Sequence, residues 1–213
     1  MRSGFGRSRS LPLAARVPAK LPDSLMGKVL AIALVVATTS GFPQSGGLCG
    51  VERWSVKIMT DRDASLVSLV PQPTTIPTLR ALAMPEELYP NRARMPPHEL
   101  KTYVLRGRLV ERRLEADQDL HLVLADPTQA DATLIVEIPA AVCAIGSPLV
   151  GLLDEARKQA QSIPLGGGVE VVGIGFFDFI HNASGQAPNG FELHPVFRVT
   201  ARPLPRQITR GAR

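Results

Sequence analysis

The sequence predicts one mainly β domain. The chain has 213 residues, of which 45% are hydrophobic and 20% are charged, the usual balance of a globular domain. Between residues 99 and 200, three strand-like segments are followed by a helix-like segment and two further strand-like segments. This is the element order of a five-stranded OB-like Greek-key barrel with one helix between strands 3 and 4. We therefore expect such a barrel over 99–200, preceded by a Pro-rich N-terminal arm over 49–98.

The five strands are expected at residues 102–112, 119–125, 132–138, 169–179 and 191–199. Gly107 in the first strand allows the bend or bulge that barrel closure needs. In the fourth strand, Gly173 and Gly175 predict a kink. Ser147 and Pro148 have the pattern of an N-cap and a first helical residue. They predict a helix whose apolar face carries Leu149, Leu152, Leu153, Ala156 and Ala160.

The arm has less regular patterns. Residues 53–60 alternate like a short strand, with Trp54, Val56 and Ile58 on one face. The Pro-rich tract 71–97 contains one predicted helix near 75–82, with Thr74 or Thr75 as its cap and a proline in its first turn. We expect the rest of the tract to be irregular chain that packs on the barrel.

The formal net charge of +5 does not by itself indicate a nucleic-acid partner, because the charges are unevenly distributed. Residues 1–48 contain six basic residues and one acid, and residues 198–213 contain five arginines and no acid. The intervening chain is therefore acidic and lacks the basic footprint of a nucleic-acid-binding domain. The first expected strand carries a basic stripe that is compatible with binding of single-stranded nucleic acid, so this function stays an alternative. The stripe consists of Arg106, Arg108 and Arg112, with Arg113 beside them. We expect residues 201–213 to form a basic C-terminal tail.

Residues 1–48 have the composition of a leader with an export signal. Lys28 precedes a nine-residue apolar run, 29–37, which small and turn-forming residues follow. A helix that crosses a bilayer needs about 20 apolar residues, so no membrane span is expected in the mature chain. The sequence therefore predicts an exported protein of the periplasm, cell envelope or extracellular space, with Met1 or Met26 as its start. A buried N-terminal strand is the alternative interpretation of 29–37.

Export affects the interpretation of the two cysteines. In an oxidising compartment Cys49 and Cys143 could form a disulfide that contributes about 4 kcal/mol of stability by restricting the unfolded chain. Two separately buried thiols are the alternative.

Four segments resemble a family of exported bacterial proteins. They are 117–124 (DQDLHLVL), 135–139 (IVEIP), 173–181 (GIGFFDFIH) and 187–196 (APNGFELHPV). The resemblance extends over about residues 49–199 and implies export and an OB-like barrel. It implies no activity and brings no catalytic residue.

Acidic and histidine side chains recur on the expected strands. One face of the second strand carries Asp117, Asp119 and His121, the third carries Glu137, and one face of the fifth carries Glu192 and His194. Asp178 and His181 end the fourth strand. Such groups from adjacent strands could bind a divalent cation, or act as an acid and base on a phosphodiester. Neither Cys-x-x-Cys nor His-Glu-x-x-His occurs, so no cofactor is predicted and only a divalent metal stays open.

Each of these residues also has a purely structural interpretation. Asp117, Asp119 and Glu192 could form the solvated face of a barrel strand. His121 could be a hydrogen-bonded sheet residue, and His194 could bond a backbone group where Pro195 lacks an N–H.

The sequence therefore favours a non-catalytic binding or interaction module whose ligand or protein partner is unknown. Its candidate ligand-binding residues are His121, Asp119, Glu137, Asp178, His181, Glu192, His194, Arg106 and Arg108. One alternative is a nuclease-like, metal-assisted phosphodiester hydrolase that uses His121, His194, Asp119 and Glu192. Another is a structural part of an envelope assembly.

Overall fold

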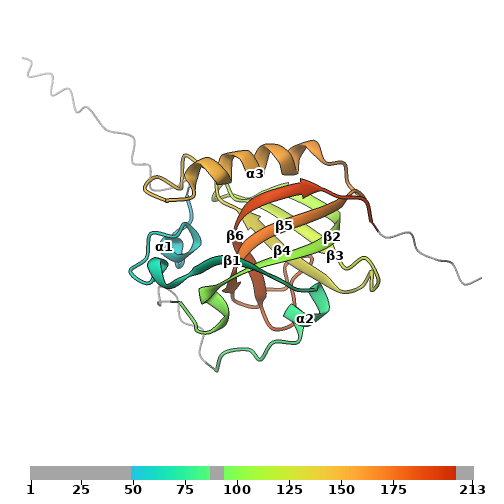
Figure 1. Ribbon diagram of the computed structural model, residues 1–213, viewed down its shortest axis with the longest axis horizontal. Coiled ribbons are helices and arrows are strands. Elements are labelled where there is room, and N and C mark those ends of the chain that lie inside the picture. Colours follow the sequence, from blue (N-terminus) through green and yellow to red (C-terminus); the bar gives the residue numbers. More distant parts are fainter. Residues whose placement is uncertain (1–48, 87–93, 205–213) are drawn as a thin grey trace, which may run out of the picture. The chain divides into compact units, whose positions relative to one another are not determined.

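The computed structural model describes residues 49–86 and 94–204 (Figure 1). The predicted leader and residues 205–213 of the predicted tail lie outside the described residues. The elements in chain order are α1 (Trp54–Lys57), the 3-10 turn η1 (Ala64–Leu66), β1 (Ser68–Pro73), α2 (Ile76–Arg80), the 3-10 turn η2 (His98–Leu100), β2 (Lys101–Leu114), β3 (Leu120–Ala125), β4 (Thr133–Ile138), α3 (Val150–Ser162), β5 (Gly168–Phe177) and β6 (Phe191–Ala201).

Five of the strands close into a mixed barrel. β2 pairs antiparallel with β3, β3 pairs antiparallel with β4, and β4 pairs parallel with β6. β6 then pairs antiparallel with β5, which closes the barrel by pairing antiparallel with β2. The long helix α3 lies between β4 and β5 in sequence and packs against β6 and β4 (Figure 1). The predicted fold class, a mainly β barrel of five strands with one helix in this position, is confirmed.

The strands place alternate side chains inside and outside the barrel. On β3 and β4 the inward side chains belong to one buried apolar cluster: Leu120, Leu122, Leu124, Leu134, Val136 and Ile138. Their neighbours His121 and Glu137 therefore face outward, where they lie directly opposite each other in the β3–β4 register. This register sets the position of the polar site described below.

The pairing of the barrel strands is irregular in two places, only one of which lies at glycines. The pairing of β2 with β3 shifts between Leu109 and Glu111 rather than at Gly107, where the bulge was expected. Gly107 instead provides a close approach, because a Cβ there would lie 2.9 Å from the Cβ of Leu124. The expected irregularity of β5 is present, since its pairing with β6 shifts at Gly173 and again before Gly175.

The predicted strand over 53–60 is wrong, because this segment forms the one-turn helix α1. Trp54 and Ile58 are four residues apart, a spacing that places them on the same face of a helix as well as of a strand. The structure decides between the two because the Trp54 indole N–H donates to the carbonyl of Cys143 at 3.2 Å, which anchors the turn to the loop after β4.

The remaining predicted and unpredicted elements differ in how well they agree with the sequence. Helix α2 lies where it was expected, and the Thr75 side chain accepts the N–H of Thr78 as its cap. Strand β1 was not predicted; it pairs parallel with β2 as a sixth strand at the end of the sheet. Helix α3 begins later than Ser147, whose Oγ accepts the N–H of Leu149 within the preceding turn.

The structure contains the predicted disulfide between Cys49 and Cys143, whose Cα atoms lie 5.5 Å apart. It joins the first described residue of the arm to the loop between β4 and α3. None of the helices in residues 49–86 and 94–204 is long and apolar enough to cross a membrane.

Candidate functional site

A row of polar side chains crosses the outer face of the barrel. His121 on β3 lies opposite Glu137 on β4, and β6 continues the row with Glu192 and His194. On β5, Phe176 pairs with Glu192. The two-residue period of each strand therefore brings four separated parts of the sequence to one place.

Glu137 holds both histidines of this row. Its Oε1 lies 2.7 Å from Nδ1 of His121, and its Oε2 lies 3.0 Å from Nδ1 of His194. Glu192 Oε1 also lies 3.2 Å from Nδ1 of His194, and Glu115 Oε1 lies 3.3 Å from Nδ1 of His121. Because an ionised carboxylate only accepts hydrogen bonds, the contact with Glu137 requires a protonated Nδ1 on His121, whereas the hydrogen bond of the His194 Nδ1 is with Glu192. Glu137 thus orients the His121 ring, and the His194 ring lies between Glu137 and Glu192.

Asp119 completes the cluster from the residue just before β3. Its Oδ2 lies 3.2 Å from Nε2 of His194, and both side chains are buried. The two atoms are not aligned for a hydrogen bond, so among the described residues neither oxygen of Asp119 and neither Nε2 of the two histidines has a hydrogen-bond partner. We use the name polar cluster for Asp119, His121, Glu137, Glu192 and His194.

Burial and mutual contact separate the proton affinities within the polar cluster. Burial raises the pKa of Glu192 to about 7, and the charge of Glu137 adds to this effect. Burial also raises the pKa of Asp119. Burial alone would raise the pKa of Glu137, but hydrogen bonds from His121 and His194 lower it well below its usual value. The pKa of His194 is raised, since its three carboxylate neighbours outweigh burial and the charge of Lys57. The cluster can therefore hold protons at Glu192 and His194 while Glu137 is ionised.

Helix α1 of the arm covers this face of the barrel. Arg53 lies over the ring of Phe176 at 4.4 Å, and the Lys57 ammonium lies 5.3 Å from the same ring. Burial lowers the pKa of Lys57, but the nearby carboxylates of Glu192, Asp178 and Glu137 raise it by more. The pKa is therefore raised overall, and the lysine is charged. The arm thus supplies positive charge to a cluster that is mainly acidic.

A cavity of about 600 Å³ lies beside the polar cluster. Its lining comes from the arm, from β2, β3, β4 and β6, and from the β2–β3 and β5–β6 loops. The charged and histidine side chains that line it are Glu52, Lys57, Arg113, Glu115, Asp117, His121, Glu137, Asp178, His181 and Glu192. Six carboxyl groups against one lysine and one arginine make this cavity acidic.

The structure brings together seven of the nine predicted ligand-binding residues and leaves two apart. Asp178 and His181 line the cavity without joining the cluster, and exposed His181 bonds the carbonyl of Phe179 at 2.7 Å through Nδ1. Arg106 lies elsewhere on β2, where its exposed guanidinium pairs with Glu170 at 2.9 Å. Arg108 lies opposite Gly168 in the β2–β5 register and does not line the cavity either.

Two structural interpretations of the sequence are wrong. Asp119 and Glu192 do not form a solvated face, because both side chains are buried. His194 contacts carboxylates rather than a backbone group. Sequence reasoning also missed Lys57 and Glu115; a lysine between the apolar residues 56 and 58 is the one signal that could have indicated a buried charge.

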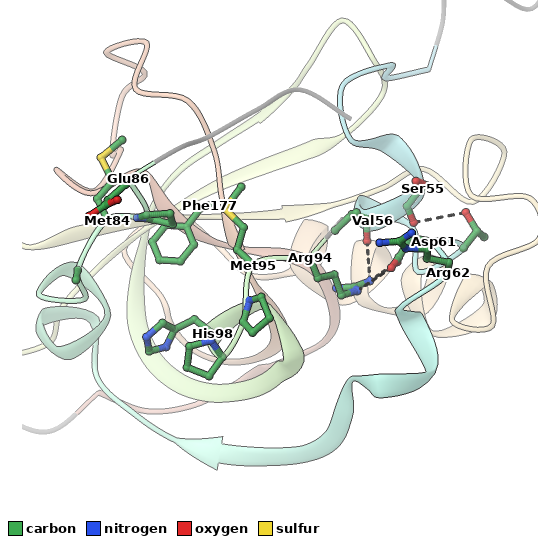
Figure 2. Close-up of a pocket in the computed structure, with 15 residues that line it drawn as sticks. Ser55, Val56, Asp61, Arg62, Met84, Glu86, Arg94, Met95, His98 and Phe177 are labelled. Carbon is green, nitrogen blue, oxygen red and sulfur yellow. Dashed lines mark hydrogen bonds and ion pairs between the residues drawn. The ribbon is translucent and has the colours of Figure 1, made fainter. Parts of the chain in front are cut away.

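A larger hollow of about 1340 Å³ lies on another part of the arm (Figure 2). Its central polar group is Arg94, whose Nη2 donates to Oδ2 of Asp61 at 2.7 Å and to the carbonyl of Val56 at 3.1 Å. The Arg94 Nη1 donates to the carbonyl of Glu99 at 3.2 Å. Because these hydrogen bonds engage the Arg94 guanidinium within the protein, it is less available to a ligand than the side chains that line the cavity beside the polar cluster.

Comparison of the sequence with models of known protein families found no match, and comparison with curated proteins found no relative. The resemblance of segments 117–124, 135–139, 173–181 and 187–196 to a family of exported proteins therefore stays an expectation. The geometry of the site carries the functional argument.

Proposed function

We propose that the protein is an exported, non-catalytic binding module on an OB-like barrel, and that its ligand enters the acidic cavity beside the polar cluster. The position of this cavity carries the proposal. OB barrels bind ligands on the face of their second and third strands, between the loop joining strands 1 and 2 and the loop joining strands 4 and 5. The corresponding parts here are β3, β4, the β2–β3 loop and the β5–β6 loop, which together line the cavity.

The charge of the cavity favours a cationic ligand. Its carboxyl groups outnumber its lysine and arginine, and a low-dielectric wall strengthens the field of such a lining. A phosphate backbone would be repelled, and the large aromatic rings Phe176, Phe177 and Phe191 are buried rather than available for stacking on bases. The module is therefore expected to bind a basic peptide or another organic cation in preference to nucleic acid.

Export is part of the same proposal. Disulfides persist in oxidising compartments, so the Cys49–Cys143 bond supports a location outside the cytosol. The division into a leader at 1–48, an arm at 49–98, a barrel at 99–200 and a tail at 201–213 belongs to the proposal too. A role in an envelope assembly would be a special case, in which the cationic ligand is part of a neighbouring protein.

A second candidate function is the metal-assisted phosphodiester hydrolase. Its specific support is that His121 and His194 lie on the same side of the barrel and share Glu137, instead of facing opposite sides. A hydrolase would need His121, which lines the cavity, to act on a bound water or phosphate. The acidic lining opposes an anionic substrate, so we rank this function second.

The test compares a basic decapeptide with a twelve-nucleotide oligothymidine as probes in low salt. The binding module predicts that the peptide shifts the amide NMR signals of the β2–β3 and β5–β6 loops, that salt weakens the effect, and that the oligonucleotide does not reproduce it. Asp178→Asn should weaken peptide binding, whereas Asp154→Asn on the exposed face of α3 should not. The absence of peptide-induced shifts at these loops would reject the cationic ligand.

Catalysis is tested separately with bis(p-nitrophenyl) phosphate, with and without Mn²⁺ or Zn²⁺. The binding module predicts no turnover above that of the metal alone. Turnover that His121→Ala abolishes, with an unchanged circular dichroism spectrum, would reject the non-catalytic proposal and establish the hydrolase.

A further inference from the structure

We infer that the outer face of β2, β5 and the end of β6 is an interaction surface for an anionic phospholipid membrane. This inference goes beyond the proposed function, because it concerns side chains that do not line the acidic cavity. It also gives a role to the arginine stripe of the first predicted strand, which the cavity does not use. We use the name basic face for Arg106, Arg108, Arg198 and Arg202 with Glu170 among them.

The register of the strands gathers the four arginines. The residues that alternate with the basic face belong to the apolar core, so the arginines point outward. These core residues are Leu105, Leu109, Val169, Val171 and Val199.

Neighbouring strands then place the outward side chains next to one another. Arg106 on β2 lies opposite Glu170 on β5, and Arg108 lies opposite Gly168. The N–H of Arg202, directly after β6, donates to the carbonyl of Gly168 at 2.8 Å. The arginines of two distant parts of the sequence therefore share one side of the sheet.

Glu170 does not neutralise the basic face. Its Oε2 lies 2.9 Å from Nε of Arg106, and its Oε1 lies 3.4 Å from Nη2 of Arg202. These contacts engage one nitrogen of each guanidinium, and the two arginine side chains are 61% and 47% exposed. None of the ion pairs among the described residues engages Arg108 or Arg198. Guanidinium groups bind phosphate oxygens in pairs, so the remaining nitrogens suit phosphate groups.

The layout of the basic face favours a membrane over a nucleic acid. Two arginines lie on β2 and two on or just after β6, with β5 between them, so the charges spread over a width of about 10 Å. Single-stranded nucleic acid is instead bound in a groove that follows one backbone, with aromatic rings on which the bases stack. The outward positions within 104–108, 168–172 and 198–202 carry no aromatic ring. Charges spread over an area match the plane of phosphates at a bilayer surface.

Exposed apolar side chains border the basic face. Val110 follows the arginines on β2 and is 41% exposed, and Leu165 in the turn before β5 is 58% exposed. The Gly166 N–H donates to the Leu109 carbonyl at 2.7 Å, which brings this turn beside the same part of β2. Binding at a membrane interface combines basic side chains with apolar ones that enter the headgroup region. A nucleic acid would have no use for these apolar groups.

The chain around the basic face adds charge of the same sign. Residues 203–213 follow directly and contain three further arginines and no acid. Glu155 on α3 opposes this charge at one border, where it lines a small groove together with Arg198. Basic residues still exceed acids here, and each of them near an anionic bilayer contributes to binding.

The experiment measures sedimentation of the full chain with vesicles of phosphatidylcholine, with and without phosphatidylglycerol, in low salt. The chain should bind the phosphatidylglycerol vesicles more tightly, and added salt should release it. Arg198→Gln should weaken this binding about fivefold, and the double variant Arg108→Gln/Arg198→Gln about twenty-five-fold. Arg62→Gln makes the same change at an exposed arginine outside the basic face and should leave the binding nearly unchanged. Glu170→Gln should strengthen it.

Three results would overturn the inference. One is equal binding to the two kinds of vesicle. Another is binding by the double variant that is as tight as that of the wild type, which would assign the binding to other charges. The third is that the double variant loses binding to a twelve-nucleotide oligothymidine but not to vesicles, which would make the basic face a nucleic-acid surface. Should the double variant not fold, Glu170→Gln decides: stronger vesicle binding supports the inference, and unchanged binding refutes it. Each failure leaves peptide binding at the acidic cavity untouched.

Discussion

Breaking the buried ion pair between Arg53 and Glu99 is expected to be the most damaging single change to the attachment of the arm. Glu99 lies in η2, next to the barrel, and accepts four hydrogen bonds. Arg53 donates from Nη1 to Oε1 at 2.9 Å and from Nη2 to Oε2 at 2.5 Å. The backbone N–H groups of Phe177 and Met95 each donate to it at 2.8 Å. The side chains of Arg53 and Glu99 are 2% and 0% exposed, so water cannot replace the lost partner.

The magnitude follows from this burial. Glu99→Gln keeps the shape of the side chain but removes the negative charge that faces the Arg53 guanidinium, and removal of one member of a buried pair costs about 3–5 kcal/mol. Arg53→Met should cost a similar amount, to which the lost contact with the Phe176 ring adds. The double variant should be more stable than the sum of the single effects predicts, because it removes both charges of the pair together.

Urea unfolding followed by two signals provides the assay. Trp54 is the single tryptophan and lies in α1, so its fluorescence reports on the arm, while far-ultraviolet circular dichroism reports mainly on the barrel. Glu99→Gln should lower the free energy of unfolding by about 3 kcal/mol or more, or separate the two transitions with fluorescence first. Glu155→Gln on the exposed face of α3 is the matched control and should change stability by less than about 0.5 kcal/mol. A loss below about 1 kcal/mol in Glu99→Gln, with coincident transitions, would refute the reasoning.

Three further expectations concern covalent linkage, pH and packing. Replacing both Cys49 and Cys143 with alanine should lower the free energy of unfolding by about 4–5 kcal/mol in the chain-entropy description, because the disulfide closes a loop of 94 residues. Urea unfolding curves recorded without reductant measure this loss. An unchanged unfolding midpoint would contradict it. Burial raises the pKa of Tyr103 to about 12, so the stability that its neutral form provides should be complete below about pH 10 and decline as the pH rises toward 12. Tyrosinate absorbance of a variant in which Tyr103 is the only tyrosine tests this, and ionisation near pH 10 would refute it. Gly175→Ala places a Cβ 2.5 Å from the His98 carbonyl oxygen in η2 and should lower the free energy of unfolding by about 1–3 kcal/mol. Gly151→Ala in α3 is the control, because its Cβ would have nothing within 4 Å and the change should be neutral or stabilising. Equal melting temperatures of the two variants would argue against the predicted clash at Gly175.

The barrel could be predicted from the sequence because its signals are local. Leu120, Leu122 and Leu124 alternate with residues of the opposite face, and alternation over a few residues is enough to indicate a strand and its inner side. The order of strands and helix then restricts the topology. The same alternation also placed His121 correctly on the face opposite the leucines.

The environment of that outer face depends on residues distant in sequence. Asp119 and Glu192 interact with Lys57 of α1, which lies more than sixty residues earlier in the chain. No periodicity within β3 or β6 encodes this interaction. The residue types were therefore enough to identify the members of the cluster as candidates. Their burial and their contacts with Glu137 could not be predicted from the sequence.

The two errors in the arm have different physical causes. Residues 54–58 are too short to distinguish a single helical turn from a strand by spacing, so a tertiary contact, the bond of Trp54 to the loop after β4, decides. Strand β1 was missed because Pro71 and Pro73 argue against a strand by composition. At the end of a sheet this objection weakens, since one side of the strand has no neighbour to bond.

Those two prolines also affect how the molecule meets other copies of itself. Among the described strands, the barrel strands are each paired on both sides, and β1 alone has an unpaired side. An unpaired strand is a template for intermolecular β-pairing, and Leu69 and Val70 make this one apolar as well as exposed. Because Pro71 and Pro73 have no N–H to donate, they would interrupt a ladder that a second chain formed along β1. The arm thus ends the sheet in a form that resists fibrous self-association.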